Sequence, residues 1–363
     1  MDLYARLDAA LATAGPAAAL DALVADRRAA GDFQAVFYAR LLAARLRFAA
    51  PPFPDGPATD IPAEHHDAFE EAIRTAGREA GTAHLERGEF SQAWAFFRMI
   101  GEPEPVRAAL DRYSPLDDAD VSPAVEVAWH HTVHPAKGFD LVLDRHGICS
   151  AITLVQSSDL SAKPEVRDHC VRRLVRALHA QLTQHFNPAE FEGDLPEDVV
   201  HVDSSHLLSV AQLSLQLSPG PEVALAVGLC DYGARLSPGL RGRDDPPFEN
   251  TYADYRRYLG VVGGGDVPGG LAHFRAKCVA GTADGYRYPA EVLVSLLDRA
   301  GLAQEALAVA REHLADADER SLTCPGPVAL AKRLGDFRAA AAVARGRNDA
   351  VGYVASMIAA GGR

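Results

Sequence analysis

The amino-acid sequence predicts an all-α fold, in which amphipathic helices follow one another as helical hairpins. Two observations carry this prediction. Apolar residues recur at intervals of three and four through long stretches of an alanine-rich chain, as a helix with one buried face requires. A turn that combines a glycine, an acidic residue and an aromatic residue recurs between such stretches, where one helix ends and the next begins.

The first predicted region, residues 1–114, consists of helical hairpins. Its apolar periodicity runs through residues 3–23, 33–48 and 69–97. The segment 49–62 is rich in proline, glycine and aspartate, residues that stop helices and form turns. We therefore expect a loop after the second helix.

The second predicted region, residues 115–245, does not follow the repeated turn and is predicted to be a His-rich central helical segment. It contains nine of the fourteen histidines. Its Val- and Ile-rich stretch 140–156 fits either a short β-hairpin or two helices on either side of Gly147, and we favour the helices.

The third predicted region, residues 246–363, contains the most regular copies of the turn. In each copy, glycine adopts a conformation that a Cβ disfavours, and the acidic residue lies at the positive end of the next helix. The aromatic residue fills the space between the helices, and a small residue lets them cross closely. The last three turns are 36 and 34 residues apart. The full and partial copies are Gly31-Asp32-Phe33 with Val36, Gly88-Glu89-Phe90 with Ala93, Gly265-Asp266-Val267 with Gly270, Gly301-Leu302-Ala303 with Ala306, and Gly335-Asp336-Phe337 with Ala340.

With this spacing, the chain from Pro246 onward resembles the tetratricopeptide-repeat family, whose period is 34 residues. The segments YPAEVLVSLLDRAGLAQEALAVAREHL and GPVALAKRLGDFRAAAAVARGRND carry the resemblance, and HLERGEFSQAWAFF extends it to one turn of the first region. The turns at Gly31, Gly88 and Gly265 are out of register, so the array is divergent. The resemblance implies a right-handed α-solenoid with a concave groove that binds a protein or peptide partner.

The composition argues against binding to nucleic acid or to a membrane. The formal charge is −13, and both partners attract clustered basic residues. The nearest such cluster, Arg167, Arg172, Arg173 and Arg176, is interpreted as a solvated helix face. Five scattered cysteines without a CxxC motif indicate a reducing compartment. Because the N-terminus lacks a basic, signal-like segment, we expect a cytoplasmic protein.

Two histidine groups of the central region have the spacing of metal ligands. His130 and His134 are four residues apart, which places two imidazoles on one face of a helix. In the second group, the carboxylate of Asp203 lies between His201 and His206, within six residues. Together these residues form the ligand set that suits zinc or non-haem iron. The predicted ligands are His130, His131, His134, His201, Asp203 and His206.

The same residues also have a structural interpretation. Asp203 precedes an apolar periodic run and suits the N-cap of a helix. His134 precedes Pro135 and would lie just beyond a helix end, which weakens its pairing with His130.

The sequence thus leaves two functions open. The first is a helical-repeat protein that binds a protein or peptide partner in a groove, and its negative charge favours a basic or mixed-charge partner. The alternative is an enzyme whose central histidines hold a divalent metal, zinc or iron. The sequence does not determine whether the chain is an enzyme, what its reaction or partner is, or its oligomeric state.

Overall fold

A computed structural model describes residues 2–53, 60–185, 193, 195 and 202–361. In these residues the chain is helical throughout and contains no β-strand, apart from one isolated bridge between Leu195 and Leu236. The all-α prediction is therefore confirmed. The chain divides into two compact units, Met1–His146 (unit 1) and Gly147–Arg363 (unit 2), and this boundary lies inside the predicted central region.

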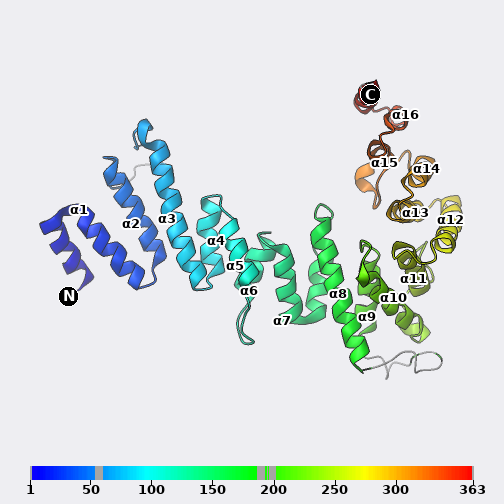
Figure 1. Cartoon of the computed structure of the whole chain (residues 1–363), viewed down its shortest axis with the longest axis horizontal. Coiled ribbons are helices and arrows are strands. Elements are labelled where there is room, and N and C mark those ends of the chain that lie inside the picture. Colours follow the sequence, from blue (N-terminus) through cyan, green and yellow to red (C-terminus); the bar gives the residue numbers. More distant parts are fainter. Residues whose placement is uncertain (1, 54–59, 186–192, 194, 196–201, 362–363) are drawn as a thin grey trace. The chain divides into compact units, whose positions relative to one another are not determined.

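In unit 1, helices that are neighbours along the chain pack against each other, α1 on α2, α2 on α3 and α3 on α4 (Figure 1). A short 3-10 helix precedes α3, and a π-helical turn follows α6. The bounds are α1 Leu3–Ala29, α2 Phe33–Arg47, the 3-10 helix Ala63–His65, α3 His66–Glu86, α4 Phe90–Met99, α5 Glu104–Arg112, α6 Ser122–Val125, the π-helical turn Glu126–His130, and α7 Pro135–Gln156, which continues into unit 2.

Helix α1 is itself a hairpin, because Gly15 has φ 83° and ψ −176° and breaks the helix in two. The Arg6 guanidinium forms an ion pair with Asp26, which joins the two halves. By length and composition alone, α1 is apolar enough to cross a membrane, a test that buried core helices of soluble proteins and signal sequences near an N-terminus also pass. The broken helix and the internal ion pair are features of a packed hairpin.

Two glycines of α3 bring it close to the next helix. A Cβ at Gly81 would lie 2.6 Å from the ring of Phe97, and one at Gly77 would lie 2.8 Å from the side chain of Ile100. Phe97 is completely buried in this position. The adjoining core continues through α5 and the π-helical turn, with Val106, Leu110, Val127 and Ala128. Close helix approach therefore depends on the absence of a side chain at these two positions.

The predicted turns have a shared geometry. Gly31, Gly88, Gly301 and Gly335 all have φ between 71° and 79°, and the small residue that follows each turn is buried. In the remaining copy, predicted at Gly265, the positive φ belongs to Gly264, one residue earlier. Three aspartates of these turns accept a hydrogen bond at the next helix: Asp32 from the Ala35 N–H, Asp266 from the Gly269 N–H, and Asp336 from the Ala339 N–H. The turn is thus a helix N-cap that follows a left-handed glycine.

In unit 2, the prediction of two helices around Gly147 is confirmed, because Gly147 has φ 77° and divides α7. Pairs of helices again pack in chain order, and Tyr232, Tyr255 and Phe274 are among their largest fully buried side chains. The bounds are α8 Pro164–His185, α9 Ser204–Ser214, α10 Pro221–Ala234, the 3-10 helix Pro238–Leu240, α11 Thr251–Val262, α12 Val267–Ala283, α13 Tyr288–Arg299, α14 Ala303–His313, the 3-10 helix Glu319–Ser321, α15 Pro327–Arg333, α16 Phe337–Gly346, and α17 Ala350–Gly361.

The basic cluster of α8 is not simply a solvated face, because two of its arginines bind a buried carboxylate. Glu222 lies in the first turn of α10, and its side chain is 3% exposed. It accepts hydrogen bonds from Arg172 and, at 2.8 Å, from Nε of Arg176. Burial of Glu222 opposes its charged form, but the two guanidinium groups outweigh this and hold its pKa below the usual value. These ion pairs join α8 to α10.

Candidate functional site

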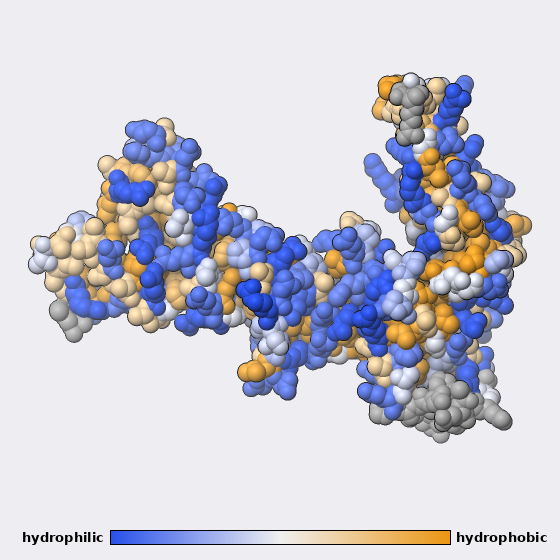
Figure 2. All heavy atoms as spheres, viewed as in Figure 1, coloured by the Kyte–Doolittle hydropathy of each residue, from blue (hydrophilic) through white to orange (hydrophobic). Residues whose placement is uncertain are grey.

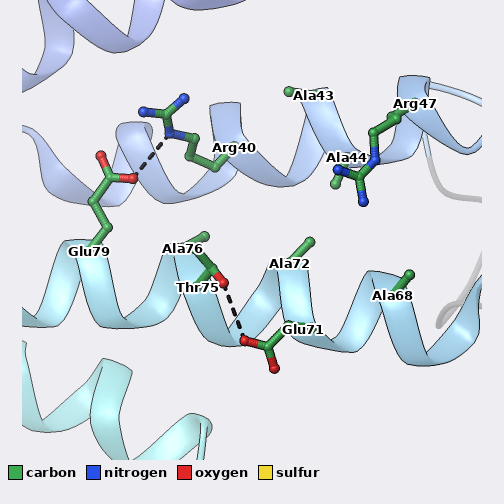
Figure 3. Close-up of a pocket in the computed structure, with 10 residues that line it drawn as sticks. All are labelled: Arg40, Ala43, Ala44, Arg47, Ala68, Glu71, Ala72, Thr75, Ala76 and Glu79. Carbon is green, nitrogen blue, oxygen red and sulfur yellow. Dashed lines mark hydrogen bonds and ion pairs between the residues drawn. The ribbon is translucent and has the colours of Figure 1, made fainter.

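A groove between α2 and α3 in unit 1 has a volume of about 520 Å³. Small side chains from both helices form its floor, and charged and polar side chains form its rim (Figure 3). This volume is in the range of ligand sites in proteins. The floor consists of Ala43, Ala44, Ala68, Ala72 and Ala76, and the rim of Arg40, Arg47, Glu71, Thr75 and Glu79.

One end of the groove is closed by an ion pair between the helices. Nε of Arg40 lies 3.1 Å from a carboxylate oxygen of Glu79, and Arg28 from α1 binds the same carboxylate. Partial burial raises the pKa of Glu79, but the hydrogen bonds from the two arginines outweigh it and leave the pKa below its usual value. Glu79 is therefore a fixed anion that joins α1, α2 and α3.

The other end of the groove carries an arginine that has no anionic partner among the residues that the structure describes. Arg47 is exposed, and its described contact is with the ring of Phe48, whose centroid lies 4.6 Å from the guanidinium carbon. Figure 3 shows this guanidinium directed from α2 toward α3, with no ion pair drawn to it. Glu71 on the opposite rim is held by Arg78 and by the hydroxyl of Thr75. The groove is thus lined by an exposed cation of α2, without an ion pair among the described residues, and by a paired anion of α3.

The exposed surface near this groove is moderately hydrophobic. In Figure 2 the surface over α1 and α2 is largely pale orange, with blue charged residues between. Sequence reasoning did not find the groove, because alanine is also the residue with the highest helix propensity. Nothing in the periodicity distinguishes an alanine that supports a helix from one that leaves space between two helices.

The predicted metal ligands of unit 1 lie in and beside the π-helical turn, but they face different surroundings. His130 lines a pocket of about 370 Å³ together with Glu126 and His146. His131 packs on the ring of Trp94, and its Nε2 lies 3.9 Å from Glu126. The turn thus separates these two imidazoles, although they are adjacent in the sequence.

His134 is engaged at both ring nitrogens. Nε2 lies 2.6 Å from a carboxylate oxygen of Asp111, and Nδ1 accepts the backbone N–H of Lys137 at 3.4 Å. This arrangement caps the start of α7, whereas the structural interpretation of the sequence placed His134 just beyond the end of a preceding helix. His134 therefore has no ring nitrogen available for a metal in this structure.

The second predicted group belongs to unit 2, and the structural interpretation of its aspartate holds. Asp203 caps α9 and accepts the backbone N–H groups of Ser205 at 2.8 Å and His206 at 3.3 Å. Hydrogen bonds from the Ser205 hydroxyl and these backbone groups hold the pKa of Asp203 below its usual value. His201 lies outside the described residues.

Among the residues that the structure describes, no three or more histidine, cysteine, aspartate or glutamate side chains are arranged to hold a metal ion. The described members of the predicted set are divided between the two units, with the three histidines of residues 130–134 in unit 1 and Asp203 and His206 in unit 2. The zinc or iron site stays a prediction of the sequence.

Comparison with models of known protein families finds no match, and comparisons with curated proteins and with solved structures find none either. The resemblance to tetratricopeptide repeats therefore continues to depend on the spacing and composition of the turns.

Proposed function

We propose that this chain is a divergent, right-handed α-solenoid that binds a peptide segment of a protein partner. The repeated turn supports the solenoid, because the same glycine conformation and the same aspartate cap recur in both units. Helices that pack on their chain neighbours also fit a repeat architecture, in which each hairpin covers the next.

The observation that carries the binding proposal is the open groove between α2 and α3. Alanines from both helices line this groove, and their short side chains leave room above the floor for atoms of a ligand. Apolar side chains of a bound segment would contact this floor and lose exposed surface. The groove is therefore a place in unit 1 where an additional segment can pack against apolar side chains.

The rim indicates the character of the bound segment. Arg47 offers a guanidinium to a carboxylate of the partner, and Glu71 offers acceptor oxygens to a basic or amide group. A segment with small or medium apolar residues between an acidic and a basic residue complements this pattern. Such a partner is of mixed charge, as the net charge of the chain also favours.

Selection of peptides from a displayed random library tests the proposal. Peptides enriched on the wild-type protein should lose at least roughly tenfold in affinity for Ala72→Phe, because a phenyl ring fills the groove. A matched control is Ala17→Phe, which adds the same ring to an exposed position of α1 outside the groove.

Both variants should retain the helical circular dichroism of the wild type, since each replaced alanine is at least partly exposed. If the library yields no peptide above background, or if the enriched peptides bind Ala72→Phe as tightly as wild type, the groove is not the binding site.

A further inference from the structure

A second pocket of unit 1 lies on the outer face of α4, beside the π-helical turn. It has a volume of about 480 Å³ and lies apart from the α2–α3 groove, with which it shares no lining residue. The π-helical turn is an uncommon element that occurs often at functional sites. The pocket is lined by Ser91, Trp94, Ala95, Arg98, Met99 and His131.

The walls of this pocket are apolar and aromatic. The indole of Trp94 and the imidazole of His131 have centroids 5.9 Å apart with their planes tilted by 39°. Met99 is 51% exposed at the end of α4, so its apolar side chain is accessible to a ligand. Tryptophan, methionine and arginine are enriched in the centres of protein interfaces, and all three occur here.

Two donors at the pocket have no acceptor in the described part of the chain, one of them exposed and the other buried. Arg98 is exposed in the last turn of α4 and makes no ion pair with any described carboxylate. Nε1 of Trp94 is buried without a hydrogen-bond partner, so rotation of the ring toward a ligand acceptor would satisfy it. Both donors favour a ligand that carries a carboxylate.

A carboxylate outside the pocket lining, that of Glu126, lies close to two of the lining residues. Glu126 accepts a hydrogen bond from the Ser91 hydroxyl at 3.2 Å and lies near His131. A second carboxylate of the ligand would approach this anion and be repelled. The pocket therefore selects one carboxylate, directed toward Arg98, beside an apolar group.

We propose that the α4 pocket binds a partner segment in which a single acidic residue lies next to an aromatic residue. The carboxylate pairs with Arg98, and the aromatic ring packs between Trp94 and Met99. This site would act independently of the α2–α3 groove, because the two share no lining residue. Its walls are aromatic, whereas the floor of the groove consists of alanines.

The indole N–H resonances of ¹⁵N-labelled protein test this proposal directly, because the chain contains two tryptophans. The probe is the capped tetrapeptide acetyl-Ala-Asp-Phe-Ala-amide, and its counterpart with Asn in place of Asp is the control ligand. We expect saturable movement of the Trp94 resonance with the Asp peptide, while Trp129, buried in the core, does not move. Trp94→Phe assigns the two resonances.

Arg98→Gln should weaken binding of the Asp peptide at least tenfold, to the level of the Asn peptide. Arg47→Gln removes the cation of the α2–α3 groove and should leave this titration unchanged, so failure of one site is distinguishable from failure of the other. The proposal is overturned if the Trp94 resonance is unmoved at millimolar peptide, if both peptides bind equally, or if Arg98→Gln binds as wild type does.

Discussion

The ion pairs of Glu222 support a prediction whose size follows from the exposure of each partner. Glu222→Gln keeps the volume of the side chain but removes the charge that binds Arg172 and Arg176. A hydrogen bond to a charged group contributes about 1.5–3 kcal/mol when it is well buried. The Arg172 side chain is 21% exposed, so roughly 2 kcal/mol is expected from its pair. Arg176 is 56% exposed, so its pair is reduced to about 0.5 kcal/mol.

The variant should therefore lower the free energy of unfolding by roughly 2–3 kcal/mol, which for a folding unit of this size lowers Tm by about 5–10 °C. Thermal unfolding followed by circular dichroism measures this. The matched control is Glu305→Gln, whose pair with Arg275 is exposed on both sides and should change stability by less than about 0.5 kcal/mol.

The pH dependence gives a second measure of the same pair. Because the folded pKa of Glu222 is lowered from 4.5, its stabilisation is present above that value and is lost as pH falls through the folded pKa. Stability of wild type should therefore decline more steeply with acid than stability of Glu222→Gln. Equal Tm values for the two proteins at neutral pH would refute the reasoning.

Three further predictions concern the fold. Gly81→Ala should destabilise the protein by roughly 1–2 kcal/mol in urea unfolding, because the ring of Phe97 occupies the space of the new Cβ. Gly260→Ala places its Cβ in open space within a helix and should stabilise the protein by up to about 1 kcal/mol. A thiol reagent should label the exposed Cys149 quickly and the four buried cysteines slowly, because burial blocks access to their thiols. Burial also raises the pKa of the Cys230 thiol to about 12, which leaves little reactive thiolate. Equal labelling rates for all five cysteines would contradict this burial. Asp203→Ala should cost about 1 kcal/mol through loss of the α9 cap, and an unchanged urea midpoint would show that the cap contributes little.

The helical class and the turns could be predicted because both depend on local chemistry. The period of apolar residues reports one buried helix face, and glycine followed by aspartate specifies a left-handed residue and an N-cap. One further copy of the turn was not predicted, because Asn348 takes the place of its glycine. Asn348 has φ 58°, and Asp349 accepts the N–H of Gly352 at 2.9 Å at the start of α17. Asparagine tolerates this conformation better than most residues, which is the signal that could have revealed it.

The candidate sites could not be predicted in the same way, because they depend on contacts between distant segments. Arg172 and Glu222 are fifty residues apart, so the sequence shows a basic helix face and gives no sign of the buried acid that it binds. Adjacent histidines mislead in the opposite direction. His130 and His131 are neighbours in the chain, yet the π-helical turn directs them into different pockets.

Photo-cross-linking tests the central claim most directly, namely that a peptide segment binds between α2 and α3. A peptide selected on the wild-type protein would carry a photoreactive benzophenone in place of one apolar residue, and mass spectrometry would locate its attachment. We predict cross-links within Phe33–Arg47 and His66–Glu86, and their loss in Ala72→Phe. Cross-links confined to unit 2, or unchanged in Ala72→Phe, would contradict the proposed function.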